Sequence, residues 1–140
     1  MFQNFSLKVT IKTIAMGAAA GVLTLLGGWD KIMEILIIFI VADYLTGVGV
    51  GIKEKKLNSE IGSKGLLKKA VIFIVIILAA QLDRIVDNPV NLFRTAAALF
   101  YIANEGLSIT ENIGKIGVPL PAFIKKVLEQ LKGKNDEVEQ

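Results

Sequence analysis

Four long apolar segments follow one another along the chain, separated by short polar connections. They cover residues 11–28, 32–52, 66–86 and 92–109. A bilayer core about 30 Å thick is crossed by about 20 helical residues, with about 17–25 tolerated. A helix also pairs its backbone groups within its own segment, which lipid requires. The pattern therefore predicts an all-α integral membrane protein with four transmembrane helices.

The connections between the segments fix how the helices follow one another. Residues 27–31 allow only a tight turn, so the first two segments are predicted to form an antiparallel hairpin, with Trp29 at the membrane interface. Ser63 is the predicted N-cap of the third helix and Asn88 that of the fourth, just before Pro89.

The first segment follows two lysines and could be taken for a signal peptide. It ends in Gly27-Gly28-Trp29-Asp30 without a small-x-small cleavage pattern, so we expect an uncleaved span. Gly17 and Gly21 form a GxxxG pattern within it and are predicted to serve helix packing.

The basic residues predict the orientation in the membrane. With four spans, 13 of the 16 lysines and arginines lie on the side that holds both termini and the loop after residue 52. Lys31, Arg84 and Arg94 lie on the other side. Because basic residues concentrate in the cytoplasm, we expect a multi-pass protein of the bacterial cytoplasmic membrane with both termini inside.

Residues 113–140 differ in kind from the bundle of residues 1–112. Apolar residues recur at helical spacing between charged ones, at Phe123, Ile124, Val127, Leu128 and Leu131. This pattern predicts a cytoplasmic amphipathic helix, which either lies on the inner membrane surface or packs on other subunits. The charged tail from Gly133 onward is expected to be disordered.

Asp43 lies near the middle of the second segment, where a charged carboxylate costs about 2.5–3.5 kcal/mol on insertion scales. Gly47 and Gly51 follow on the same helical face and allow close helix approach. One interpretation is an oligomer contact that becomes a pore lining. The alternative is a carboxyl group hydrogen-bonded inside one folded bundle.

The fourth segment carries a polar stripe on one helical face. The stripe consists of Arg94, Ala98, Tyr101, Glu105, Ser108 and Asn112, flanked by Asn104 and Glu111. Because a polar face in lipid must turn toward protein or water, the stripe is a candidate lumen. Alternatively, Arg94 belongs to the outer interface and the residues from Glu105 onward to the inner one.

The composition gives no basis for catalysis. The chain has no Cys and no His, which removes thiolate chemistry, the usual zinc and haem ligands and the commonest general base. It also lacks an intramembrane serine–lysine arrangement, a phosphate loop and a metal motif. We therefore expect a protein that is not an enzyme, with no catalytic residue, cofactor or metal. The lysine-rich loop lacks interleaved aromatics, which argues against nucleic acid as a partner.

Five groups of motifs in register resemble the toxin-secretion/phage-lysis holin family, over roughly Ile35 to Lys132. They are Asp43-Tyr44-Leu45-Thr46-Gly47; Leu57-Asn58-Ser59 with Gly62-Ser63-Lys64-Gly65-Leu66-Leu67-Lys68-Lys69; Leu82-Asp83-Arg84; Tyr101-Ile102-Ala103-Asn104-Glu105-Gly106-Leu107-Ser108-Ile109; and Glu111-Asn112 running into Gly117-Val118-Pro119-Leu120-Pro121. The family's Asp-x-x-Thr-Gly corresponds to Asp43, Thr46 and Gly47. Its Asn-Glu-x-x-Ser corresponds to Asn104, Glu105 and Ser108. Some members have three spans, which leaves the role of the first segment open.

The resemblance implies a protein that accumulates in the lipid bilayer, forms large homo-oligomers and opens lesions through which an endolysin, or a secreted toxin, leaves the cell. Two other functions stay open at this point. One is a toxin-release accessory or holin antagonist of the same family. The other is a small membrane scaffold or ion-conducting subunit that never forms large holes.

Overall fold

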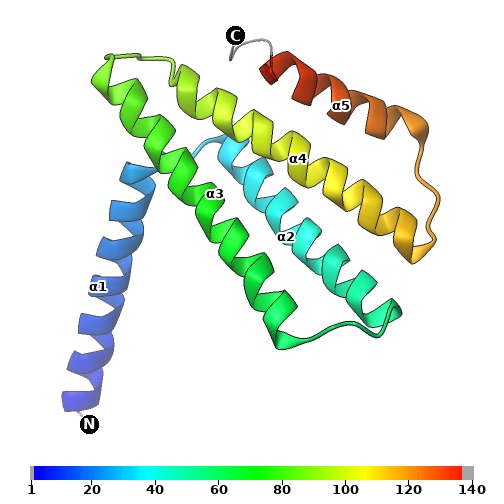
Figure 1. Cartoon of the computed structure of the whole chain (residues 1–140). Coiled ribbons are helices and arrows are strands. Elements are labelled where there is room, and N and C mark those ends of the chain that lie inside the picture. Colours follow the sequence, from blue (N-terminus) through cyan, green and yellow to red (C-terminus); the bar gives the residue numbers. More distant parts are fainter. Residues whose placement is uncertain (1, 137–140) are drawn as a thin grey trace.

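The computed structural model describes residues 2–136, and this part of the chain consists of five helices and no strands. The helices are α1 (Phe2–Leu25), α2 (Lys31–Lys53), α3 (Ser59–Ile85), α4 (Leu92–Ile116) and α5 (Ala122–Asp136). The predicted all-α class is therefore confirmed (Figure 1).

α4 is the central helix of the bundle, because it packs against α2, α3 and α5, whereas α2 and α3 touch each other only slightly. Burial of apolar side chains from α2, α3 and α4 stabilises this arrangement. The shared core includes Met33, Leu36, Ile76, Ala98 and Ile102. The outward faces of α2 and α3 are also apolar, with Ile38, Leu45, Ile74 and Leu78 exposed. Helices that are apolar all round are typical of membrane spans.

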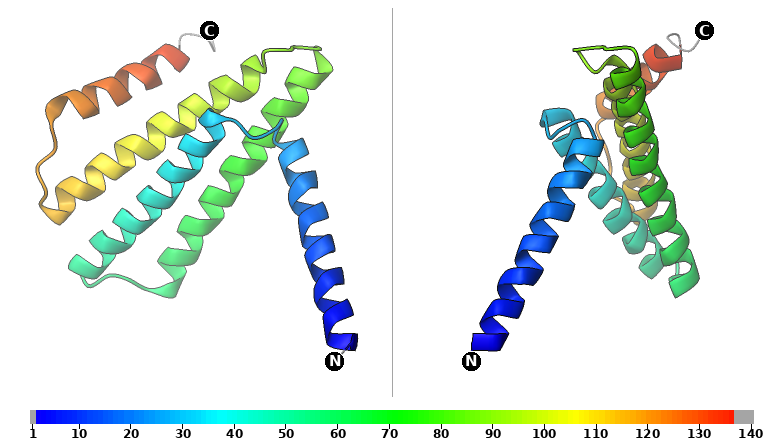
Figure 2. Two further views of the ribbon diagram at one scale, coloured as in Figure 1. Left: turned by 180° about the vertical axis from the view of Figure 1, so that it is seen from behind. Right: turned by 90° about the vertical axis from the view of Figure 1, so that its left-hand side faces the viewer.

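α1 stands apart from the bundle (Figure 2). Its described side chains are exposed throughout, and it contacts only α3, near its own C-terminal end. There the Gln81 side chain donates a hydrogen bond to the Leu25 carbonyl at 3.0 Å. The predicted tight turn is confirmed, but the predicted hairpin is wrong, because α1 and α2 diverge from the turn and do not pack on each other.

Three helices in the described part of the chain are long and apolar enough to cross a membrane: Ser6–Leu25, Lys31–Lys53 and Ser59–Ile85. The span predicted at 32–52 nearly coincides with α2, and the one predicted at 66–86 lies largely within α3. α4, which contains the span predicted at 92–109, is not among the three. Its place in the bundle comes from its packing against α2 and α3, and four spans remain a prediction.

Two predicted helix starts need correction. The pattern of apolar residues does not show where a helix begins when its first turn is polar. α3 begins at Ser59, and its N-cap is Asn58, whose Oδ1 accepts a hydrogen bond from the Ile61 amide at 2.8 Å. Ser63 therefore lies inside the helix. α4 begins after Asn91 rather than Asn88, and it continues past residue 109 to Ile116, where Gly117 ends it with φ of 101°.

α5 runs back along α4 after the connection that contains Pro119 and Pro121 (Figure 1). Leu128, which is 8% exposed, packs against Gly106 of α4. In the single chain, therefore, the amphipathic helix packs on its own bundle. The helix includes residues 133–136, where disorder was predicted, and the end of the charged tail (137–140) lies outside the described residues.

Candidate functional site

Three helices bring opposite charges together in the interior of the bundle. Lys69 of α3 lies between Asp43 of α2 and Glu105 of α4, and all three side chains are 12–13% exposed. The Lys69 Nζ lies 2.6 Å from the Asp43 Oδ2 and also donates a hydrogen bond to the Glu105 carboxylate. A charge in an apolar surrounding is tolerated when it is paired and hydrogen-bonded. This ion-pair network therefore explains how Asp43 is accommodated.

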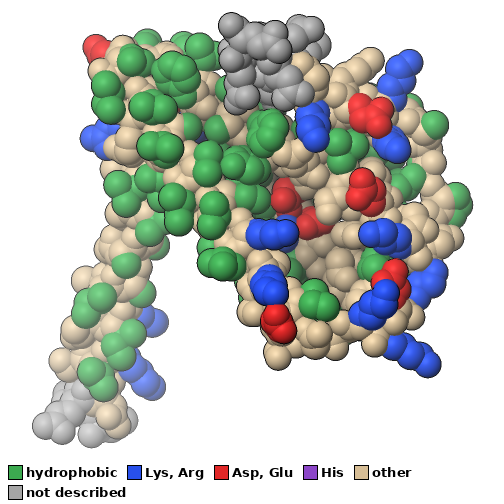
Figure 3. Space-filling view, in the orientation of Figure 1, with side chains coloured by type: hydrophobic (Ala, Val, Ile, Leu, Met, Phe, Trp, Pro, Cys, Tyr) green, Lys and Arg blue, Asp and Glu red, His purple; other side chains and the backbone are tan. Residues whose placement is uncertain are grey.

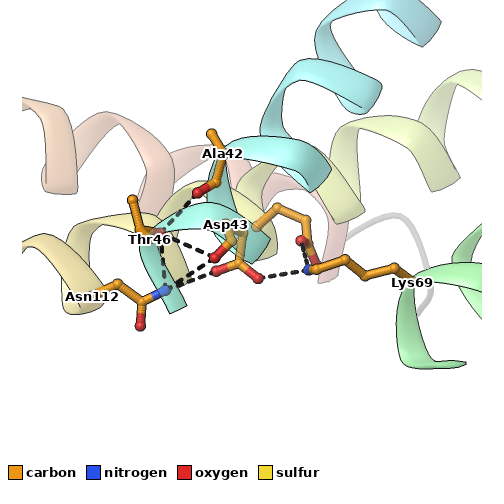
Figure 4. A network of polar contacts seen from close by, with 6 residues as sticks. Ala42, Asp43, Thr46, Lys69 and Asn112 are labelled. Carbon is orange, nitrogen blue, oxygen red and sulfur yellow. Dashed lines mark hydrogen bonds and ion pairs between the residues drawn. The ribbon is translucent and has the colours of Figure 1, made fainter. Parts of the chain in front are cut away.

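Neutral side chains extend the network toward the end of α4 (Figure 4). The Asn112 Nδ2 donates to the Asp43 Oδ1 and to the Thr46 Oγ1, each at 3.1 Å. The Thr46 hydroxyl in turn donates to the Ala42 carbonyl at 2.9 Å. The single chain therefore satisfies the Asp43 carboxylate without a second subunit.

The network borders a cavity of about 510 Å³ between α2 and α3. The two helices separate here, and glycines from both walls line the space: Gly47 and Gly51 from α2, Gly62 and Gly65 from α3. Figure 3 shows acidic and basic side chains around a hollow on this face of the molecule. We call this space the glycine-lined cleft. Lys69, Asp43 and Glu105 lie at its inner end, so one lysine faces two carboxylates beside an open space.

The polar stripe of α4 faces the interior of the single chain. Glu105 and Ser108 line the glycine-lined cleft, and Asn112 bonds to Asp43. Tyr101 and Asn104 line a groove between α3 and α4. Glu111 is exposed beside the connection to α5. The stripe therefore does not form one continuous surface in the single chain.

Arg94 belongs to a second cluster, at the other end of α4. Its guanidinium is 1% exposed and lies in the turn between α1 and α2. The Nε donates to the Leu26 carbonyl at 2.5 Å, one terminal nitrogen to the Gly28 carbonyl at 2.9 Å, and the other to the Asp30 Oδ2 at 2.6 Å. We call this set of bonds the Arg94 clamp. It fixes the α1–α2 turn on the start of α4, and in the single chain Arg94 faces protein rather than a lumen.

Sequence reasoning assigned no role to Asp83, which completes this cluster. Asp83 is 1% exposed, and its carboxylate accepts hydrogen bonds from the amides of Phe93 at 3.0 Å and Arg94 at 2.8 Å. It thereby satisfies amides at the N-terminus of α4, where no Asn91 side-chain cap is made. The sequence signal that could have indicated this role is the position of Asp83 in Leu82-Asp83-Arg84, just before a predicted turn.

Asp30 is the outer member of the Arg94 clamp and lies outside the spans. It also caps α2, since its Oδ1 accepts a hydrogen bond from the Met33 amide at 3.0 Å. The hydrogen bond from Arg94 holds the pKa of Asp30 below its ordinary value, against the opposing effect of desolvation. The clamp is therefore a charge-assisted contact.

The glycines predicted to allow close helix approach differ in how much of the described chain lies beside them. A Cβ on Gly17 or Gly21 would have nothing within 4 Å. One on Gly47 would have only the Asn112 Nδ2, at 3.7 Å, and one on Gly51 would lie 3.1 Å from the Leu57 Cδ1. Gly17, Gly21 and Gly47 are therefore open in the single chain, whereas Gly51 is crowded by Leu57.

Comparisons with known proteins identify the family. The model of the bacteriophage holin family matches residues 20–133. An uncharacterized protein of Clostridium perfringens is 49% identical over 110 residues, covering 79% of this chain and 82% of the relative. A protein of Bacillus phage phi105 named "Probable holin" is 42% identical over 111 residues, covering 79% and 81%.

One relative also covers the segment that the family model leaves out. An uncharacterized protein of Listeria monocytogenes is 34% identical over 134 residues, covering 96% of this chain and 95% of the relative. No solved structure matches the chain significantly. The family match extends from the end of α1 through α5, well over half of the sequence, and the chain therefore belongs to the bacteriophage holin family.

Proposed function

We propose that this protein is a holin that oligomerises in the cytoplasmic membrane and permeabilises it, so that an endolysin reaches the cell wall. The observation that carries the proposal is the ion-pair network of Lys69, Asp43 and Glu105 beside an open cleft, in a chain of this family. A bundle that served only as a lipid anchor would have no use for three charges at this depth. The function requires no catalytic residue, cofactor or metal ion.

The proposed topology has four spans, with the N-terminus, the α2–α3 connection and the α4–α5 connection on the cytoplasmic side. The distribution of lysines and arginines supports it, as does the way α4 packs along α2 and α3 between the two ends of the bundle (Figure 1). In this topology residues 1–112 form the membrane bundle. The region from residue 113 onward begins at the cytoplasmic end of α4, and α5 runs back along α4 from there.

The open glycines provide the proposed contacts between copies. Gly17 and Gly21 on the exposed α1, and Gly47 at the glycine-lined cleft, allow close approach of a helix from another copy. At Gly51 the Leu57 side chain must first move aside. Within the cleft, Asp43, Glu105 and Ser108 are then polar groups that a neighbouring copy reaches, and Thr46 is joined to Asp43 through Asn112. Gly47→Leu should reduce the oligomer size in detergent, whereas Gly114→Leu, on the exposed side of α4, should leave it unchanged.

Induced expression tests the function directly. Expression should collapse the membrane potential and stop growth abruptly, and co-expression of an endolysin should then lyse the cells. Normal growth with abundant protein in the membrane would contradict the proposal. Ion flux without passage of the endolysin would indicate a conducting subunit, delayed lysis by another holin would indicate an antagonist, and selective passage of a toxin would indicate a secretion accessory.

A further inference from the structure

α5 lies alongside α4 at the depth of the bundle. Leu128 fills the space left by Gly106, where a Cβ would come within 2.6 Å of the Leu128 Cδ2 and 3.1 Å of the Phe39 Cε2. Gly106 lies well inside α4, about 15 Å from its C-terminal residue Ile116 at 1.5 Å per residue. The docked α5 is therefore not confined to the end of the bundle.

The outer surface of the docked α5 carries several charged side chains, with Phe123 and Val127 exposed beside them. Lys125 and Glu129 form a pair at 3.9 Å, with side chains 64% and 56% exposed. Lys126 and Lys132 are exposed on the same helix. This face contrasts with the outward faces of α2 and α3, where Ile38, Leu45, Ile74 and Leu78 are exposed.

A lysine-rich face at this depth is incompatible with surrounding acyl chains, because charged groups in the hydrocarbon core are strongly disfavoured. Long side chains near a helix end can reach the interface, but Lys125, Glu129 and Lys132 extend over two turns of α5. The polar stripe of α4 cannot supply the water-facing surface instead, since it is turned toward α2 and α3.

We propose that the docked α5 forms the water-facing wall of the assembled lesion, with Lys125, Lys126, Glu129 and Lys132 toward the aqueous lumen and the outward apolar faces of α2 and α3 toward lipid. This inference rests on the proposed holin function and names the surface that faces water within it. α5 then stays on α4 during permeabilisation. The competing possibility, that α5 leaves α4 and lies on the membrane surface, becomes an outcome of the test.

Undocking α5 is the first test. Leu128→Asp places a carboxylate against Gly106 and Phe39, so α5 cannot stay docked, and release of a trapped dye from proteoliposomes should be lost. Val118→Asp, which adds the same charge at an exposed position of the α4–α5 connection, should keep the release of the unmodified chain. Release by Leu128→Asp at or above the rate of the unmodified chain would overturn the proposal. Absence of release by the unmodified chain itself would contradict the proposed function instead.

Locking α5 onto α4 is the second test. It shows whether α5 stays docked even if Leu128→Asp fails to fold, a failure that circular dichroism would reveal. The chain has no cysteine, and the close approach of Gly106 to Leu128 brings Gly106→Cys and Leu128→Cys within reach of a disulfide. Oxidation of this double variant should cause no loss of dye release. Loss of release on oxidation, restored by a reductant, would show that α5 must leave α4.

Labelling checks which faces meet water in the assembled protein. A single cysteine in Glu129→Cys should react with a membrane-impermeant maleimide, whereas one in Ile74→Cys, on the outward face of α3, should stay protected. Protection of position 129 in the assembled protein would overturn the proposal.

Discussion

The two polar clusters of the bundle differ in how completely they are enclosed. At one end of α4, Arg94 and Asp83 are each 1% exposed, and the bonds of Arg94 go to backbone carbonyls of the α1–α2 turn and to Asp30. Toward the other end, Lys69, Asp43 and Glu105 are 12–13% exposed and border the glycine-lined cleft. Both clusters pair charges through α4, and the second has space beside it in which side chains can rearrange.

This difference distinguishes a polar cluster that stabilises the fold from one that is available for function. A buried charge with every partner supplied by the same chain holds a fold together, because removing any partner leaves another unpaired. A network beside a cleft can exchange a partner for water or for a group of another copy at lower cost. We therefore expect substitutions in the Arg94 clamp to act on folding, and substitutions around Lys69 to act on assembly and permeabilisation.

The largest effect is expected at the Arg94 clamp. Arg94→Met should lower the free energy of unfolding by about 2–4 kcal/mol, because the carbonyls of Leu26 and Gly28 and the half-exposed Asp30 carboxylate lose their donor. Reversible unfolding in detergent micelles, followed by circular dichroism, measures it. Arg84→Met, at an exposed arginine of α3, is the matched control and should stay within about 0.5 kcal/mol. Equal losses of unfolding free energy for Arg94→Met and Arg84→Met would show that the Arg94 clamp does not stabilise the fold.

A smaller loss is expected at Lys69. Lys69→Met leaves Asp43 and Glu105 without their shared cation, but water in the cleft can hydrate them, so we expect about 1–3 kcal/mol. The double variant Lys69→Met/Glu105→Gln removes one of the two carboxylates and should recover part of this loss. The same unfolding measurement, with dye release alongside, tests both variants. Additive effects of the two substitutions would show that the charges act independently.

Alanine substitutions at one glycine beside each cluster test the difference between the clusters directly. Gly27 has φ of 79°, and a Cβ there would lie 2.9 Å from the Arg94 Cδ, so Gly27→Ala should destabilise the fold by about 1–3 kcal/mol. Gly47 lies in a helix, and its nearest neighbour would be 3.7 Å away, so Gly47→Ala should stabilise the single chain by about 0.5–1 kcal/mol. Thermal unfolding in detergent compares them. A destabilising Gly47→Ala would mean that the cleft is as tightly packed as the clamp.

The smallest effect concerns pH. Because the hydrogen bond from Arg94 lowers the pKa of Asp30, this carboxylate stabilises the fold above the unfolded-state pKa of about 3.9. The stabilisation is lost as the pH falls through the lower folded-state value. The melting temperature of the unmodified chain should therefore drop slightly more in strong acid than that of Asp30→Asn. Thermal unfolding scans at successive pH values test this prediction. An identical drop in melting temperature for both chains would show that the Asp30–Arg94 pair gives no net stabilisation.

The apolar pattern predicted α2 closely, because lipid and core both demand apolar residues along its whole length. It placed the start of α3 too late, since Ser59–Gly65 is helical but polar and exposed. Asp43 and Glu105 stood out as charges inside apolar segments, yet Lys69 did not, because it directly follows Lys68 near the predicted interface. The Arg94 clamp could not be predicted, since two of its acceptors are backbone carbonyls, which have no signature in sequence.

The Arg94 clamp also joins parts of the chain that are synthesised far apart in time. Arg94 and Asp30 are separated by 64 residues, so α2 and α3 are complete before the guanidinium exists. Until α4 leaves the ribosome, the carbonyls of Leu26 and Gly28 have only water or lipid headgroups to accept hydrogen bonds from. The direction in which α1 leaves the bundle is therefore fixed late in biogenesis. A nascent chain that stops before Leu92 contains the three helices that are long and apolar enough to cross a membrane, but it lacks the residue that clamps the α1–α2 turn.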